Sequence, residues 1–351
     1  MKKFEIKHFG LTVFLVATIS FIILGLIDTP NTNNGNIVST AQKDTGKGYM
    51  LGISGFTPAN FPDSSTDDLE KYWKEINNYT DIYGIHVGID GLSLLDTAAS
   101  SLSVPFEVVT GLKESENWLD NKDRVLNTLT TYLNKYPQIK YLALGNEINI
   151  HYDLDSEKFD NFFEAYKYLY TELKKKFPDL KISTTFQYEA LIGSGFLMGK
   201  DNPDETDMVG EMLDYLDVVS LTVYPYFDFK NPDEIPLDYF AKLLTITSKP
   251  IVITETGWIS RSKYIGSYAY LTDQGYSGSE DEQVKYLSKL VELIKEYGIE
   301  YANWIGLNDF YLWSESSNPF EGHELFDSIG LRHNDGREKL VWDKWVELIV
   351  R

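Results

Sequence analysis

The sequence predicts an α/β protein built as a (β/α)8 TIM barrel, and two observations support this. Short apolar runs alternate with amphipathic stretches of helical spacing from residue 48 to the end of the 351-residue chain, a pattern typical of parallel strands joined by helices. There are eight such runs, which is the number of strands that closes this barrel. We therefore expect a single domain over residues 48–351.

The predicted strands are rich in β-branched and aromatic residues, which favour a pleated sheet. They cover residues 49–56, 83–90, 105–112, 140–148, 181–189, 217–227, 250–258 and 301–310. The intervening helices are clearest after the fourth strand, where aromatic and leucine residues recur at helical spacing. Before the eighth strand, Ser279 and Glu282 form a capping-box pattern and Gly298 can end the helix. Helices around residues 92–102 and after the fifth strand are predicted from weaker patterns.

The N-terminal segment has the pattern of an export signal. Lys2, Lys3 and Lys7 precede an uncharged, mostly apolar run from Phe9 to Ile27, and this run is long enough to span a bilayer. Both a cleaved signal peptide and an uncleaved membrane anchor fit residues 1–27. Either one places the rest of the chain outside the cytoplasm, secreted or tethered to the outer face of the cell membrane, behind a flexible polar linker at residues 28–47.

Composition restricts the kind of partner. The net charge of −21 and the pI near 4.6 argue against nucleic acid and other polyanions, which require a basic surface. The absence of cysteine excludes disulfides, thiol nucleophiles and cysteine-ligated metals. Aromatic residues make up 14% of the chain, which fits a well-filled core and also fits the flat rings on which sugars stack. A neutral partner agrees best with these totals.

Two apolar strands each deliver a glutamate near the carboxyl end. The run "KYLALGNEI" ends with Asn146 and Glu147, and "PIVITETGW" contains Glu255. A carboxylate at the edge of a core requires either a structural partner or a chemical role. Active sites of these barrels lie at the carboxyl ends of the strands, and the fourth and seventh strands face each other across the ring. Two carboxyl groups so placed have the arrangement that a retaining glycosidase requires.

Three short motifs resemble the retaining glycoside hydrolases of clan A. They are "GNEI" at the fourth strand, "VYPYF" (Val223 to Phe227) at the sixth and "ITETGW" (Ile253 to Trp258) at the seventh. The last two are most similar to the β-1,3-glucanase family and to the endo-β-1,4-galactanase family. The resemblance extends over the predicted barrel and implies that same fold, with catalysis through a covalent glycosyl-enzyme.

The resemblance also implies a role for each matching residue. Glu147 corresponds to the general acid/base and Glu255 to the nucleophile. Asn146 would hydrogen-bond the sugar 2-hydroxyl, and Tyr224 would hold the nucleophile carboxylate. Trp304 would form the aromatic floor under the sugar.

The sequence offers further candidate residues. Trp258 is a candidate sugar-stacking platform. The clan often has an arginine near the end of the second strand, where this chain has His86 and Asp90, so we expect the support of the nucleophile to differ here. His86 is also a candidate substrate-binding residue. Glu189 and Asp309 also fall near strand ends and are candidates for bonds to sugar hydroxyls.

The expected function is hydrolysis of a β-linked neutral polysaccharide or oligosaccharide, without metal, nucleotide or redox cofactor. Two alternatives remain open: a non-catalytic carbohydrate-binding surface protein that keeps the barrel, and a cell-wall transglycosylase that uses the same residues. Intact glutamates at both strand ends favour an enzyme, because binding alone does not require both. The sequence leaves open the sugar, the linkage, endo or exo action and the oligomeric state.

Overall fold

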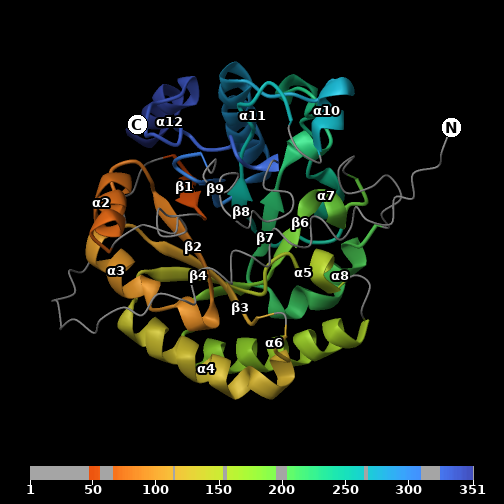
Figure 1. Ribbon diagram of the computed structural model, residues 1–351. Helices are drawn as coiled ribbons and strands as arrows, with labels where there is room; N and C mark the ends of the chain where they lie inside the picture. Colours follow the sequence, from red (N-terminus) through yellow and green to blue (C-terminus); the bar gives the residue numbers. More distant parts are fainter. Residues whose placement is uncertain are drawn as a thin grey trace.

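The computed structural model describes residues 47–55, 66–113, 115–152, 156–194, 204–264, 268–309 and 325–350. They form a ring of strands surrounded by helices (Figure 1). The expected signal or anchor at residues 1–27 and nearly all of the expected linker at 28–47 lie outside the described residues. Within the described ranges, no helix combines the length and apolarity needed to cross a membrane.

The sheet confirms the predicted barrel. Its strands are β1 (Met50–Ser54), β2 (Ile82–Gly88), β3 (Phe106–Gly111), β4 (Ile139–Leu144), β5 (Lys181–Ser183), β6 (Thr185–Gln187), β7 (Val219–Val223), β8 (Ile251–Thr256) and β9 (Tyr301–Ile305). Their order is β5-β4-β3-β2-β1-β9-β8-β7-β6, and neighbouring strands pair in parallel. The predicted fifth strand is divided into β5 and β6 around Thr184. Because these two are consecutive in the chain, the ring closes there with eight strand positions.

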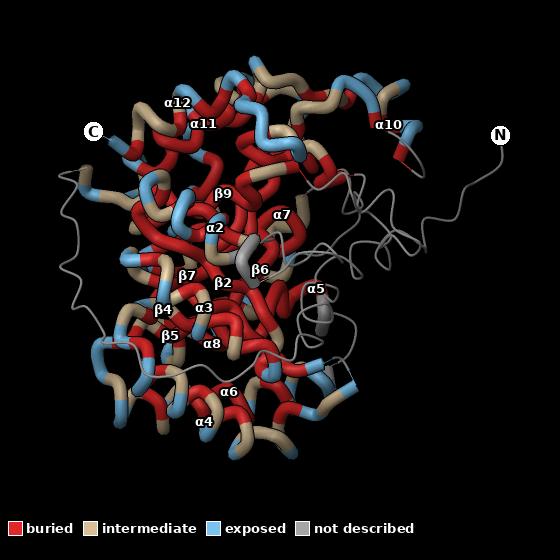
Figure 2. Tube along the Cα trace, turned by 60° about the vertical axis from the view of Figure 1, so that its left-hand side comes forward, coloured by how far each residue is buried: buried red, intermediate tan, exposed pale blue. Residues whose placement is uncertain are grey.

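Helices cover the outside of the ring, and the strands between them are mostly buried (Figure 2). The α-helices are α2 (Thr66–Ile76), α3 (Leu94–Ser101), α4 (Trp118–Lys135), α5 (Ile148–Tyr152), α6 (Ser156–Lys176), α7 (Tyr188–Leu191), α8 (Thr206–Met212), α9 (Ala241–Leu244), α10 (Ala269–Asp273), α11 (Glu280–Tyr297) and α12 (Leu340–Val350). The predicted ends of α11 are confirmed: Ser279 Oγ accepts the Glu282 N–H at 3.2 Å, and Gly298 terminates the helix with a φ of 61°. The weaker predictions correspond to α3 and α8.

The barrel interior is apolar at one end and polar towards the other. At the amino ends of the strands, an apolar cluster forms from Ile82, Val218, Val252 and Tyr301. Two residues further along, the same faces carry Gly84, Ser220 and Asn303, as the alternation of a strand requires. A Cβ on Gly84 would lie 2.5 Å from Cβ of Ser54 and 2.9 Å from a carboxylate oxygen of Glu107. Glycine at this position therefore makes room for polar side chains inside the ring.

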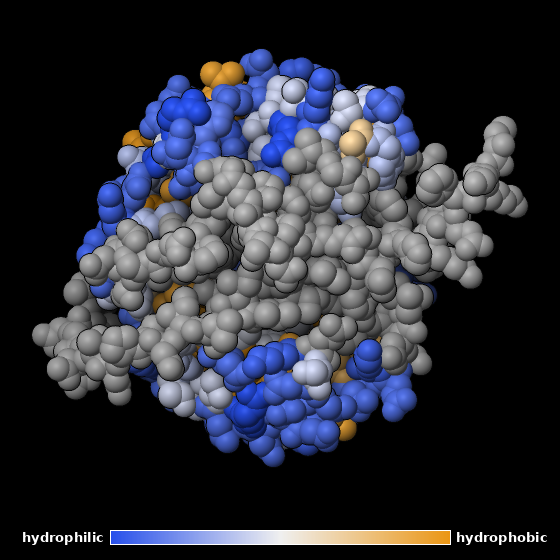
Figure 3. All heavy atoms as spheres, in the orientation of Figure 1, coloured by the Kyte–Doolittle hydropathy of each residue, from blue (hydrophilic) through white to orange (hydrophobic). Residues whose placement is uncertain are grey.

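The described residues on the face shown in Figure 3 are predominantly hydrophilic, with scattered hydrophobic side chains. This agrees with the acidic composition of the chain. Among the exposed large hydrophobic residues of the described ranges, Leu244 lies on α9, Tyr270 on α10 and Leu340 on α12. Single exposed hydrophobic residues of this kind are ordinary on a protein surface.

Candidate active site

Glu147 follows β4 in a backbone conformation that few residues adopt. Its φ of 46° lies in the left-handed region, where it is the one non-glycine residue of the described chain with positive φ. Such a conformation costs about 1–3 kcal/mol and is typical of functional sites. Thr185 of β6 supports it: its Oγ1 accepts the Glu147 N–H at 2.7 Å and donates to Oδ1 of Asn146 at 2.8 Å. The next strand of the barrel therefore fixes both residues of the "NE" pair.

A β-bulge aims Glu255 into the barrel. Ile253 of β8 pairs with Leu221 of β7, but Glu255 pairs with Thr222, the very next residue of β7. The extra residue, Thr254, donates its hydroxyl to the Leu221 carbonyl at 3.1 Å. A bulge of this kind reverses the side-chain alternation beyond it. Glu255 therefore faces the same interior as Thr222, whereas an unbroken strand would have placed it on the outer face with Ile253.

Two side chains hold the Glu255 carboxylate, one on each oxygen. The Tyr224 hydroxyl donates to Oε2 at 2.6 Å, and Nδ1 of His86 lies 2.7 Å from Oε1. Tyr224 follows β7 directly, and His86 lies within β2. The position of Tyr224 beside Glu255 is the one that the motif resemblance implied. His86 contacts Glu255 itself and so lies where it can support this carboxylate, while its substrate-binding role stays a prediction. Asp90 pairs instead with Arg124 at 2.8 Å on the surface.

Thr222 lies next to both glutamates. Its hydroxyl donates to Oε1 of Glu147 at 2.5 Å, and its backbone lies beside that of Glu255 in the sheet. Burial and the negative charge of Glu255 raise the pKa of Glu147 to about 8, while the Thr222 hydroxyl acts in the opposite direction. Glu147 is therefore protonated at neutral pH and can donate a proton.

His86 is the basic group at this site. Burial lowers the pKa of His86, but its contacts with Glu107 and Glu255 outweigh burial and raise the pKa to about 9. At neutral pH the imidazole therefore carries a positive charge beside the Glu255 carboxylate. One glutamate is thus held as an acid near a second one that faces a cation and a hydroxyl donor.

The predictions that Trp304 and Trp258 lie under a bound sugar are both wrong. Trp304 has no exposed surface; it packs against Tyr286 of α11 and Trp345 of α12, outside the barrel, and its Nε1 donates to the Ile329 carbonyl at 2.8 Å. Its neighbour Asn303 takes the inward position. Trp258 is equally buried, against Tyr286 of α11 and Tyr226, which follows β7. With buried strands on both faces, the sequence pattern did not reveal which side each ring takes.

Glu189 is a structural partner of the site. It is fully buried, and its Oε1 accepts the Tyr239 hydroxyl at 2.5 Å and the Tyr224 N–H at 2.9 Å. Burial raises the pKa of Glu189 to about 7, against the opposing effect of the Tyr239 hydrogen bond. The expectation that Glu189 binds a sugar hydroxyl is therefore wrong, and its bond to the Tyr224 backbone positions the residue that holds Glu255.

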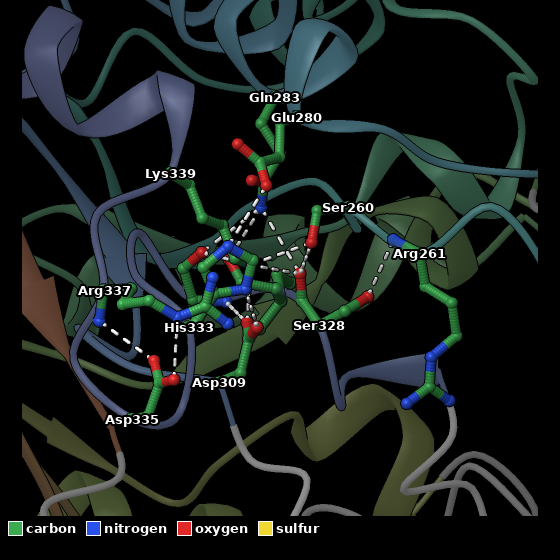
Figure 4. A network of polar contacts seen from close by, with 12 residues as sticks. Ser260, Arg261, Glu280, Gln283, Asp309, Ser328, His333, Asp335, Arg337 and Lys339 are labelled. Carbon is green, nitrogen blue, oxygen red and sulfur yellow. Dashed lines mark hydrogen bonds and ion pairs between the residues drawn. The ribbon is translucent and has the colours of Figure 1, made fainter.

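Asp309 belongs to a buried ion pair beside the barrel (Figure 4). Its Oδ1 lies 2.6 Å from Nζ of Lys339, whose side chain is 0% exposed. The same Nζ donates to Ser260 Oγ at 2.9 Å, to the Ser328 carbonyl at 3.0 Å and to the Gly330 carbonyl at 2.9 Å. The expected sugar contact of Asp309 is wrong. The pair joins the closing segment of the chain to the loops that follow β8 and β9.

Three residues of the site were missed from the sequence. Glu107 was detectable, because "PFEVVTGL" has a charged residue inside an otherwise apolar strand, and such a residue needs a partner or a role. Thr185 and Thr222 gave no signal, since threonine is ordinary in strands. Among the described residues, no group of three or more His, Asp or Glu side chains could hold a metal ion.

Comparison with known proteins defines the fold. No protein-family model and no curated protein matches the chain. An active-site mutant of Rhizomucor miehei β-1,3-glucanosyltransferase in complex with laminaritriose matches with a TM-score of 0.55 at 16% identity, over 84% of this chain and 96% of that one. β-Glucuronidases of an uncultured Clostridium sp. and of Dictyoglomus thermophilum match with TM-scores of 0.57 at 12% and 11% identity, over 86% of this chain.

The present chain spans 50% of the length of each of these two β-glucuronidases. At such low identity, the likeness to these structures establishes the fold alone. The protein has the TIM-barrel fold of glycosidases and glycosyl-transferring enzymes.

Proposed function

We propose that the protein is a retaining glycoside hydrolase that cleaves a β-linked neutral polysaccharide or oligosaccharide. The observation that carries this proposal is the pair of buried glutamates with opposite surroundings. Glu147 is held as a protonated acid beside Thr222, and Glu255 is held between His86 and Tyr224. This is the division between acid and nucleophile that retaining glycosidases use.

In the first step, a carboxylate oxygen of Glu255 attacks the anomeric carbon as the glycosidic bond breaks. Glu147 transfers its proton to the leaving oxygen, which departs as a neutral alcohol. Asn146 lies next to Glu147, and the bond from Thr185 to its Oδ1 fixes the orientation of its amide. We assign an amide N–H of Asn146 to the sugar 2-hydroxyl, where a hydrogen bond strengthens in the transition state.

In the second step, the charge that kept Glu147 protonated is absent, because Glu255 is now an ester. Glu147 has given up its proton and, as a carboxylate, removes a proton from water while the water attacks the anomeric carbon. Glu255 leaves as a carboxylate, and its returning charge raises the pKa of the newly protonated Glu147 again. One electrostatic coupling therefore serves both halves of the cycle.

The proposed substrate follows from charge and from the motifs. A net charge of −21 repels polyanionic substrates, and "VYPYF" with "ITETGW" resembles enzymes that act on β-glucans and β-galactans. Laminaritriose is the ligand in the matching glucanosyltransferase structure. We place the enzyme outside the cytoplasm, secreted or tethered by residues 1–27, because of their basic start and uncharged run.

Glycosyl transfer is the second candidate. The matching β-1,3-glucanosyltransferase is covered over 96% of its length, and transfer would use the same intermediate with a sugar acceptor in place of water. A purely carbohydrate-binding protein agrees less well with the site, because binding does not require a strained glutamate with a raised pKa.

The test is digestion of a panel of β-glucans, β-galactans, mannans and xylans, with an aryl β-glucuronide as the charged comparison. Products are sized by chromatography, and their anomeric configuration is read by NMR before mutarotation. Release of β-configured sugars from a neutral polymer is the expected result. Products longer than the substrate would favour transfer, and cleavage of the glucuronide alone would contradict the neutral substrate.

A further inference from the structure

His86 occupies the place where the resembling enzymes often carry an arginine, and an imidazole, unlike a guanidinium, can lose its charge. One ring nitrogen, Nδ1, contacts Oε1 of Glu255 at 2.7 Å. The other, Nε2, lies 3.9 Å from Oε2 of a second carboxylate, Glu107, as an ion pair beyond hydrogen-bond distance. The imidazole therefore lies between two negative groups, both of them buried.

Glu107 is anchored from the far side of the barrel. It lies within β3 and is 1% exposed, and its Oε2 accepts a hydrogen bond from Nδ2 of Asn303 on β9. Burial raises the pKa of Glu107 above its ordinary value, although His86 and the Tyr301 hydroxyl act in the opposite direction. The space that Gly84 leaves open is the one its carboxylate enters. The sequence thus places a carboxylate inside the ring, directly behind His86.

We propose that Glu107 is a positioning residue that holds His86 as an imidazolium against Glu255, so that the nucleophile keeps a cationic partner throughout the reaction. The assignment rests on the proposed function for the role of Glu255 and on geometry for the ionisation of His86. Glu107 touches no reacting atom and acts through the imidazole alone.

The contribution of Glu107 is greatest when Glu255 carries sugar. The ester has no charge, so His86 loses one of its two negative neighbours at that stage. Glu107 remains, and its charge keeps the buried imidazolium compensated until Glu255 leaves as a carboxylate. Other titratable groups around this cluster are Glu147, which is protonated in the free enzyme and a carboxylate in the glycosyl-enzyme, and the hydroxyls of Tyr224 and Tyr301, whose pKa values burial raises above the ordinary range.

The test begins with the ionisation of His86 in the full chain labelled with nitrogen-15 histidine. The chain has five histidines, and His86→Gln identifies the signal of interest. In the unaltered protein, we expect His86 to remain an imidazolium at neutral pH and to titrate at about 9. In Glu107→Gln, which keeps the shape of the side chain, we expect a midpoint at least about one pH unit lower, a tenfold loss of proton affinity.

Glu300→Gln is the matched control. Glu300 precedes β9 at the opposite end of the barrel, where it accepts the Tyr141 hydroxyl at 3.0 Å, so the His86 midpoint should not move. An unaltered protein in which His86 is neutral at pH 7 would overturn the proposal. An unchanged midpoint in Glu107→Gln would overturn it as well.

The second measurement follows kcat/KM of Glu147→Ala on dinitrophenyl β-glycosides against pH. These substrates need no acid, so the alkaline loss of activity reports on the nucleophile and its partners. Adding Glu107→Gln should shift that loss downward by about the same amount as the NMR midpoint, at least about one pH unit. If the alkaline limb of the kcat/KM profile does not move, Glu107 does not support Glu255. If the unaltered protein cleaves no glycoside, the proposed function fails, while the NMR result still decides the ionisation of His86.

Discussion

Replacement of Thr222 by valine tests the acid role of Glu147 most sensitively. Valine has nearly the shape of threonine but lacks the hydroxyl that donates to Oε1 of Glu147 at 2.5 Å. That bond stabilises the carboxylate form, so its loss should raise the pKa of Glu147 above the value of about 8 that burial and Glu255 set. An acid that must be protonated would then stay active to a higher pH.

The size of the shift follows from the kind of bond that is removed. A hydrogen bond to a charged group contributes about 1.5–3 kcal/mol, which corresponds to about one to two pH units. In the unaltered protein, the alkaline limb of kcat/KM on the cleaved polysaccharide should lie at a pH of about 8. In Thr222→Val it should move up towards about 9, the pKa of His86, where loss of the imidazolium becomes limiting. The assay is a pH profile of initial rates.

Thr80→Val is the matched control for this prediction. Thr80 is also buried, and its Oγ1 accepts the Ile53 N–H at 3.1 Å, but it precedes β2 at the far end of the barrel. Both variants should lose about 1 kcal/mol of unfolding free energy, and only Thr222→Val should shift the limb. A limb that stays in place in Thr222→Val, or moves to lower pH, would refute the assignment of Glu147 as the acid.

Two further predictions concern the acid and the framework. Glu147→Ala should slow cleavage of the natural polysaccharide by about two to four orders of magnitude while sparing glycosylation by an aryl glycoside with a good leaving group. The first rate is measured in the steady state and the second from the burst of the released aryl group. Equal losses on the two substrates would contradict this. Lys339→Met should lower the free energy of unfolding by about 3–5 kcal/mol, because it leaves the buried Asp309 carboxylate without its cation. Denaturant titration measures the free energy of unfolding, and the double variant Lys339→Met/Asp309→Leu should recover most of the lost stability. A loss below about 1 kcal/mol in Lys339→Met would contradict the prediction.

The barrel could be predicted from the sequence because its signals are local. Apolar runs, helical stripes, the Ser279 cap and the Gly298 terminus each follow from short-range preferences, and the structure has each of them. The position of Tyr224 beside Glu255 could also be anticipated, because it follows from strand order and motif together.

The direction of side chains could not be predicted in the same way. Strands buried on both faces show no alternation of polar and apolar residues, so Trp304 gave no sign that it packs outward on Trp345. The bulge at Thr254 depends on hydrogen bonding to β7, which no local pattern records. The pairing of His86 with Glu107 and Glu255 joins three strands and required the assembled barrel.

Covalent labelling of Glu255 tests the central claim most directly. In a 2-deoxy-2-fluoro β-glycoside of the cleaved sugar, the fluorine slows both steps of the reaction. An activated leaving group still lets the first step proceed, so the glycosyl-enzyme should accumulate. Mass spectrometry of the digested protein should find the added sugar on the peptide that contains Glu255, held in the structure by Tyr224 and His86. Sugar on another carboxylate, or a natural product released with inverted anomeric configuration, would contradict the account.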